Sequence, residues 1–132
     1  MEMRFNLDPI MDGPILNEKR EEKRKGALII ATNGMHRIAD FFETVTIIDQ
    51  LYENGKDGPM GRTPYVIMFD GDKVLDYDRG KCFIGSAIII KYDMKKGVLP
   101  LKDEEIDEAI KEFESRLITL AWEGQEYSAY DL

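Results

Sequence analysis

The sequence predicts an α+β fold: a mostly antiparallel sheet of about five strands, one long C-terminal amphipathic helix and a shorter N-terminal helix. Two observations lead to this fold class. Short apolar runs rich in β-branched residues recur between clusters of Gly, Pro, Asn and Asp, as strands do. Near the C-terminal end the apolar residues change to a helical spacing. At 132 residues we expect one domain over 1–132, with 1–26 and 125–132 as peripheral segments.

The first expected strand is Ala27–Thr32, "ALIIAT", and the pair Asn33-Gly34 then marks a turn. The residues beyond this turn are ambiguous. Apolar residues from Ile38 to Leu51 recur at a helical spacing, yet Thr44–Ile48 is β-branched, which favours a strand. We expect a short helix over Met35–Glu43 and then a strand, with helix against strand left open for 44–52.

In the middle of the chain we expect a loop and three strands. The glycine- and proline-rich segment Glu53–Pro64 is typical of a mobile loop. Tyr65–Phe69 and Lys73–Asp78 have strand patterns, and Asp70-Gly71-Asp72 between them predicts a hairpin. Cys82–Tyr92 is almost wholly apolar, which predicts a central strand covered on both faces, and Gly85 inside it indicates a bulge or a close contact.

The C-terminal helix is expected within Leu99–Gly124. Acidic residues occupy its first turn, where they favour the helix dipole, and Gly124 is a plausible stop. Phe113 lies at the centre of the apolar stripe and is expected to pack the helix on the sheet. The stripe consists of Ile106, Ala109, Ile110, Phe113, Leu117 and Leu120.

The negative charge of the chain is concentrated near its C-terminus. The formal net charge is −8; residues 1–101 hold 16 acids and 15 bases, whereas residues 102–132 hold 10 acids and 3 bases. Such a field repels nucleic acid and favours basic partners. An acidic helix face can also serve solubility alone, and that alternative stays open. The candidate partner-binding residues are Glu104, Asp107, Glu108, Glu112 and Glu114.

Four aspartates, Asp70, Asp72, Asp76 and Asp78, form a candidate metal site, with Lys73 and Lys81 as companions. The pattern of a calcium-binding loop fails, because a loop beginning at Asp70 would place Val74, Leu75 and Lys81 at positions that need an acid, a glycine and a bidentate acid. A two-metal hydrolase needs acids that converge from separate elements. We therefore favour a hairpin with solvated carboxylates over a metal site.

A second candidate site follows the first strand. Asn33, Gly34, His36 and Arg37 lie at an expected helix start, where backbone N–H groups can bind an anion, and Arg62 could reach them from the loop. These residues would suit an anionic nucleotide.

The remaining candidate residues also have purely structural explanations. Cys82 is the only cysteine and is expected to be a packed thiol; nothing in the sequence supports its pairing with His36 as a nucleophile. Trp122, Tyr127 and Tyr130 form either an aromatic contact strip or the edge of a core.

The second half resembles a small domain-of-unknown-function family of phages and mobile elements in Firmicutes. The resemblance covers roughly residues 53–114 and rests on "NGKDG", "DGDKVLDYDRGKCFIGSAIII" and "LKDEEIDEAIKEFE". Lys102 replaces the usual Ser or Thr cap, and "PMGRTPY" replaces the Asn and Leu positions after the turn. The matching positions are Tyr77, Asp78, Gly80, Phe83 and Ile84 in the strand, and Glu105 and Ile106 in the helix. The resemblance implies a phage or mobile-element accessory protein and brings no catalytic residues.

Three functional hypotheses follow. The leading one is a non-enzymatic accessory or anti-defence protein that inhibits a basic, nucleic-acid-handling host protein through its acidic surface. The alternatives are a protein that sequesters an anionic nucleotide and a small metal-dependent hydrolase. We expect no cofactor, no direct contact with nucleic acid and no membrane association, and a homodimer stays open. With no recognisable secretory signal or membrane-spanning run, we expect a soluble protein in the host cytoplasm.

Overall fold

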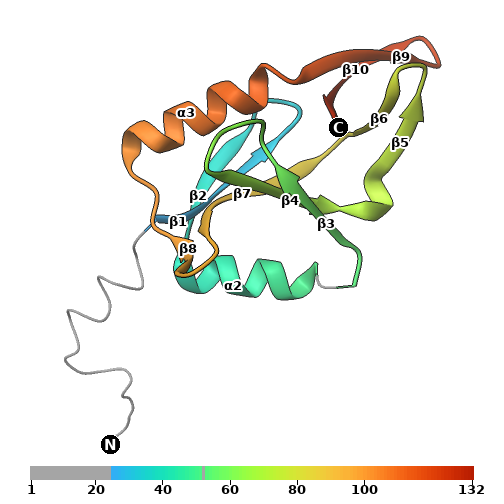
Figure 1. Cartoon of the computed structure of the whole chain (residues 1–132). Helices are drawn as coiled ribbons and strands as arrows, with labels where there is room; N and C mark the ends of the chain where they lie inside the picture. The colour runs from blue at the N-terminus through green and yellow to red at the C-terminus, as the bar shows by residue number, and fades with distance from the viewer. Residues whose placement is uncertain (1–24, 52) are drawn as a thin grey trace, which may run out of the picture.

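The computed structural model describes residues 25–51 and 53–132, which form two antiparallel sheets (Figure 1). The first sheet has the order β2-β1-β7-β4-β3, with β8 also paired to β7. Its strands are β1 Lys25–Ala31, β2 His36–Asp40, β3 Gly55–Pro59, β4 Tyr65–Asp70, β7 Ser86–Asp93 and β8 Gly97–Leu99. The second sheet has the order β5-β6-β10-β9. Its strands are β5 Val74–Tyr77, β6 Gly80–Phe83, β9 Leu117–Trp122 and β10 Gln125–Asp131.

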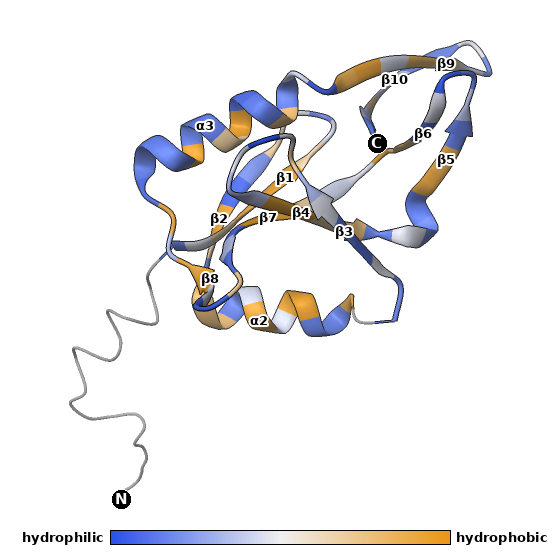
Figure 2. Ribbon diagram, in the orientation of Figure 1, coloured by the Kyte–Doolittle hydropathy of each residue, from blue (hydrophilic) through white to orange (hydrophobic). Residues whose placement is uncertain are grey.

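Two helices, α2 (Phe41–Gln50) and α3 (Asp103–Glu114), cover opposite faces of the first sheet (Figure 1). The central strand β7 is apolar on both faces for this reason. Its Ala87 and Ile89 lie in the cluster beneath α3, and its Ile88 and Ile90 lie in the cluster on the α2 side. Figure 2 shows hydrophobic residues concentrated along these central strands.

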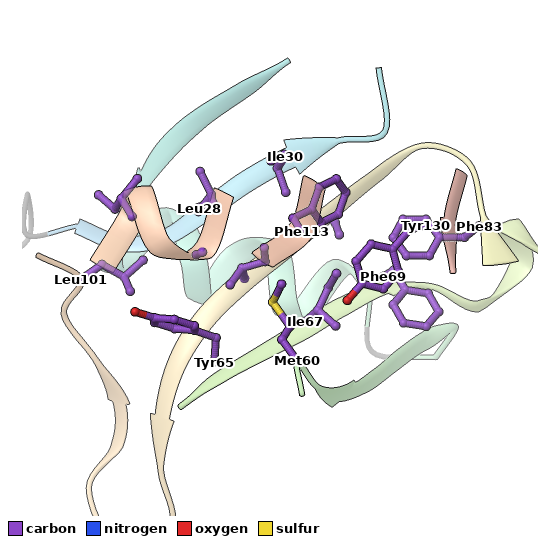
Figure 3. Packing of buried hydrophobic residues seen from close by; sticks show 14 residues of the cluster. Leu28, Ile30, Met60, Tyr65, Ile67, Phe69, Phe83, Leu101, Phe113 and Tyr130 are labelled. Atoms are coloured by element: carbon purple, nitrogen blue, oxygen red, sulfur yellow. The ribbon is translucent and has the colours of Figure 1, made fainter. Parts of the chain in front are cut away.

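A column of aromatic rings connects the two sheets (Figure 3). Phe69 of β4 stacks on Phe83 of β6, with ring centroids 4.7 Å apart. Phe83 stacks on Tyr130 of β10 at 5.2 Å, and Tyr130 stacks on Phe113 of α3 at 4.9 Å. Phe113 is fully buried, as expected from its place on the apolar stripe. The column therefore joins the first sheet, the second sheet and α3 into one core.

The expected fold of one five-strand sheet with a long C-terminal helix is wrong. The described residues contain ten strands in two sheets and two short helices, and α3 ends at Glu114. Leu117–Trp122 forms β9 instead of continuing the helix, because Glu123 and Gly124 both have positive φ, 51° and 79°, and so close a two-residue hairpin. The C-terminal segment 125–131, expected to be peripheral, is β10, an inner strand of the second sheet. Of the expected N-terminal peripheral segment, residues 1–24 lie outside the described residues, and Lys25 and Gly26 begin β1.

The order of helix and strand after the first turn is also the reverse of the prediction. His36–Asp40 is β2, paired with β1, and Phe41–Gln50 is α2. Asp40 explains the helix start, because its carboxylate accepts a hydrogen bond from the Glu43 amide at 2.8 Å. The β-branched residues that suggested a strand are held in a helix by packing of Ile47 and Ile48 on the first sheet, which outweighs their weak propensity.

The expected hairpin at Asp70-Gly71-Asp72 does not form, because β4 belongs to the first sheet and β5 to the second. Gly71–Lys73 is instead a 3₁₀ turn through which the chain passes between the sheets. Glycine is needed here for close approach, since a Cβ on Gly71 would lie 2.8 Å from the carbonyl oxygen of Asn54. The expected loop 53–64 contains strand β3, and the expected strand 82–92 divides at Gly85, where the chain returns to the first sheet.

Candidate functional site

The acidic candidate site lies on α3, which is held firmly against the first sheet. The helix start is fixed by Glu105, whose carboxylate accepts the backbone N–H of Lys102 at 2.9 Å. Glu105 also forms an ion pair with Lys91 of β7, and this hydrogen-bonded contact, aided by the Lys102 amide, lowers the pKa of Glu105. Ile106 and Phe113 are buried beneath the helix. The exposed carboxylates are therefore presented from a rigid support.

Two of the five predicted acids are engaged within the protein. Glu108 accepts a hydrogen bond from the Tyr65 hydroxyl at 2.5 Å, and Glu112 forms an ion pair with Arg116 at 2.9 Å. Burial of Tyr65, followed by this hydrogen bond, raises the pKa of Tyr65 well above its ordinary range. Both contacts occupy carboxylates that would otherwise be free to bind a partner protein.

The other three predicted acids, Glu104, Asp107 and Glu114, are exposed. Among the described residues none of the three has a hydrogen-bond or ion-pair partner. Their spacing of three and seven residues places them on one side of the helix. We call Glu104, Asp107 and Glu114 the acidic face. Such unpaired carboxylates can accept hydrogen bonds from the Lys or Arg side chains of a partner.

The second candidate site gathers most of its predicted residues at the turn between β1 and β2. Asn33, His36 and Arg37 line a shallow pocket together with Ile29 and Ser86. Arg37 pairs with Glu43 of α2 at 2.7 Å, and this contact raises the pKa of the guanidinium. No helix begins at Gly34, so the expected anion site at a helix N-terminus is absent from this turn.

Arg62 does not join this site. The β1–β2 turn lies beside Ser86, at the start of β7, whereas Arg62 precedes Tyr65, which is paired with Lys91 near the end of β7. Ser86 and Lys91 are separated by about 16 Å along an extended strand.

A pocket beneath α2 adjoins the turn and was missed in the sequence. Its volume is about 350 Å³, and it shares Ile29, Arg37 and Ser86 with the turn pocket. Much of its lining is apolar, from Ile29, Ile47, Leu51, Met68 and Ile88, and charged groups of both signs, Arg37, Lys73 and Asp70, also border it. No local signal could have revealed this pocket, because its residues come from separate elements that only the fold brings together.

The four aspartates do not converge. Asp70 accepts a hydrogen bond from the Asp72 amide at 2.9 Å within the 3₁₀ turn, so its carboxylate serves the turn. Asp76 is paired with Lys81 across the β5–β6 hairpin at 2.6 Å, and Asp78 lies exposed at the hairpin end. Over 25–51 and 53–132, no three His, Cys, Asp or Glu side chains are grouped closely enough to hold a metal ion.

The remaining candidates are separated by the fold. Cys82 is buried in the second sheet, where desolvation raises the pKa of its thiol, while His36 is exposed on the first sheet. Tyr130 is a core residue, whereas Trp122 is 62% exposed, so the three C-terminal aromatics do not form one contact strip.

Comparison with family models, curated proteins and solved structures finds no match to this chain. The resemblance to a phage and mobile-element family therefore stays a prediction. Within the part of the chain that the structure describes, no helix is both long and apolar enough to cross a membrane.

Proposed function

We propose that this protein is a non-enzymatic binding protein that engages a basic partner through the acidic face of α3. The observation that supports it best is the set of three exposed carboxylates, Glu104, Asp107 and Glu114, without partners among the described residues, on a firmly packed helix. Interactions of this kind steer encounter with a positively charged surface.

We also propose a specific biological setting for this binding function. The partner is a nucleic-acid-handling protein of the host cytoplasm, and the acidic face competes with nucleic acid for its basic groove. The excess of acids in residues 102–132 supports this choice of partner. The resemblance of residues 53–114 supports an accessory or anti-defence role in a phage or mobile element.

The test is the double charge reversal Glu104→Lys with Asp107→Lys. Both side chains are exposed, so we expect a stability loss below about 1 kcal/mol, arising mainly from the helix dipole at the first turn. Binding should weaken through a slower on-rate and lose its dependence on salt. Glu108 is unsuitable for this experiment because it bonds Tyr65.

The matched control is Asp49→Lys with Glu53→Lys, which changes the net charge equally at exposed positions on and just after α2. Each variant is used to capture partners from host lysate, and the captured proteins are identified by mass spectrometry. A basic protein bound by the parent and the control but lost from the α3 variant supports the proposal. Equal capture by all three chains at low salt contradicts it.

A second candidate function is the binding of an anionic small molecule in the pocket beneath α2. The observation in its favour is that Arg37 and Lys73 border a largely apolar cavity beside the predicted residues Asn33 and His36, although Asp70 also lines it and Arg37 is paired with Glu43. A nucleotide that binds there should raise the melting temperature of the parent chain but not that of Ile47→Trp, which fills the pocket. No grouping of the aspartates supports the metal-dependent hydrolase.

A further inference from the structure

The side of the first sheet that faces α2 is less completely covered than the side that faces α3. In the described part of the chain, the α3-side cluster holds fourteen buried residues, whereas the α2-side cluster holds four, with seven apolar residues only partly buried against it. The reason is the position of α2, which packs mainly on β1 and β2. Val66 and Met68, the apolar residues of β4 on this side, therefore remain partly exposed.

An apolar groove lies over β4 on this side of the sheet. Its volume is about 510 Å³, and residues of α2, β3, β4, β7 and β8 line it. Asp57 is the one charged residue among the described residues of its lining, and Tyr92 of the lining is 47% exposed. We call this hollow the β4 groove. Its other apolar residues are Ile48, Pro59, Val66, Met68, Ile90 and Val98.

Further exposed apolar side chains lie next to the β4 groove. Val45 is 57% exposed, and it precedes Ile48 of the lining by three residues, so both lie on the same side of α2. Met94 follows Tyr92 by two residues and is 91% exposed. A concentration of exposed apolar side chains around a groove is typical of a surface that another segment covers.

The described chain begins beside this groove (Figure 1). The carbonyl of Lys25 accepts a hydrogen bond from the Leu101 amide at 2.8 Å, shortly after β8, which contributes Val98 to the lining. Gly26 lies against the first turn of α2, because a Cβ on Gly26 would be 2.8 Å from Oγ1 of Thr44. Lys25 therefore lies close to both β8 and α2, two elements that border the groove.

Residues 1–24, which precede this point, have the composition and length needed to reach the β4 groove. Half of the positions in 1–16 hold Met, Phe, Leu or Ile, whereas residues 17–24, "NEKREEKR", are charged except for Asn17. The nine residue steps from Leu16 to Lys25 allow a reach of up to about 30 Å. Only β7 separates β1 from β4, a distance of about 10 Å. The groove is therefore well within reach.

We propose that residues 10–16 dock in the β4 groove of the same chain, with residues 17–24 as a charged tether. The docking side chains are the apolar ones of this segment, Ile10, Met11, Ile15 and Leu16. A short tether gives the segment an effective concentration in the millimolar range at the groove. A second copy at micromolar concentration competes poorly with it, and the net charge of −8 opposes such self-association.

The docked segment completes the α2-side core. The acidic face of α3 lies on the opposite side of the first sheet, and the segment leaves it uncovered. The inference is therefore independent of the proposed binding function, and either one can fail without the other.

The first test measures how fast N-ethylmaleimide reacts with a cysteine placed beside the groove, in Val45→Cys. Adding Ile15→Ser with Leu16→Ser should speed this reaction about tenfold, because a segment docked about 90% of the time leaves the thiol open for only the remaining tenth. Thr46→Cys is the matched position, since Thr46 is exposed on the other side of α2, and its rate should not change. The buried Cys82 does not interfere in the folded chain.

The matched control in the tether is Glu21→Ser with Glu22→Ser, which should leave the rate in Val45→Cys unchanged. If Ile15→Ser with Leu16→Ser does not alter that rate, the proposal is overturned. Equal acceleration of Thr46→Cys also overturns it, because the whole of α2 has then loosened. Protection of Val45→Cys that increases with protein concentration identifies a second copy as the occupant and rejects docking within one chain.

A cross-linking test keeps all four docking side chains intact. Asn17→Cys combined with Val45→Cys should be joined efficiently by a short bismaleimide, and the product should have the mass of a single chain. Asn17→Cys combined with Thr46→Cys should give a much lower yield, although the two positions are adjacent on α2. Equal yields from the two pairs overturn docking in the groove, and a product with the mass of two chains assigns the groove to a second copy.

Discussion

At the scale of single residues, the bond between Tyr65 and Glu108 connects the core to the surface that we propose for binding. Tyr65 is buried in β4, and its hydroxyl reaches the Glu108 carboxylate on α3 at 2.5 Å. The bond removes one carboxylate from the acidic face and fixes the helix to the first sheet. Glu112 is similarly used by Arg116. Whether one of these acids can bind another protein therefore depends on whether its carboxylate is already bonded within the chain, and not on its exposure alone.

Replacement of Tyr65 by Phe should lower the free energy of unfolding by about 1–2 kcal/mol, because it removes a hydrogen bond to a charged group while leaving the ring in place. The measurement is urea denaturation. Tyr127→Phe is the control, because the Tyr127 hydroxyl bonds Gln125 at an exposed position and should contribute little. Equal effects of the two substitutions would show that the Glu108 bond is no stronger than a surface contact.

The buried tyrosines should also make the fold sensitive to alkaline pH. Burial is the main cause that raises the pKa of both Tyr65 and Tyr130. These groups stay protonated in the folded state at a pH where the unfolded chain loses the proton, so their contribution to stability is constant below about pH 10 and falls above it. The expected result is a decreasing free energy of unfolding above that pH, measured by denaturant titration. The decrease should be smaller in Tyr65→Phe, and an unchanged slope in that variant would contradict the assignment.

At the scale of elements, the charge and the start of α3 could be predicted but its end could not. The acidic first turn and the buried Phe113 follow directly from residue type and spacing. The stripe continues through Leu117 and Leu120, however, and a helical spacing of three residues does not by itself exclude a strand. The signal that ends the helix is the Glu123-Gly124 turn, which folds β9 back against β10. Its effect depends on strand pairing, which a local pattern does not contain.

A local sequence pattern contains no long-range contacts, and this also explains which residues of the candidate sites could be predicted. Glu104, Asp107 and Glu114 were identified because charge is a property of the sequence itself. The roles of Glu108 and Lys73 depend on contacts with distant elements, β4 in the first case and the α2 pocket in the second. The β2–α2 order was reversed because Asp40 was not recognised as a helix cap.

The turn between β9 and β10 gives a prediction at this scale. Glu123 has a φ of 51°, which is unfavourable for most residues but tolerated by Asn. Glu123→Asn creates the Asn-Gly pair preferred in two-residue hairpins and should stabilise the fold by up to about 1 kcal/mol. Glu126→Asn removes the same charge without a positive φ and should be close to neutral. Thermal denaturation of both variants tests this, and equal shifts would mean that charge, not turn geometry, is responsible.

At the scale of the whole molecule, the aromatic column makes the two sheets interdependent. Between Gly71 and Gly85 the chain leaves the first sheet for the second and then returns to it. Phe83 lies in the middle of the column, touching Phe69 on one side and Tyr130 on the other. Phe83 and Tyr130 are the buried residues of the second sheet in this core, with Val74 and Leu117 packed against it, so the second sheet should not remain folded when the column is broken.

Phe83→Ala should therefore lower the free energy of unfolding by about 3–5 kcal/mol, the cost of a large cavity in a buried aromatic site. Phe42→Ala is the matched control, since Phe42 is 75% exposed on α2 and should be nearly neutral. In the parent chain, fluorescence of Trp122 reports on the second sheet and amide exchange of β7 reports on the first. Both probes should give the same stability, because the rings couple the sheets into one cooperative unit. A second sheet that unfolds at lower denaturant than β7 in the parent chain would show that the column does not couple the two sheets.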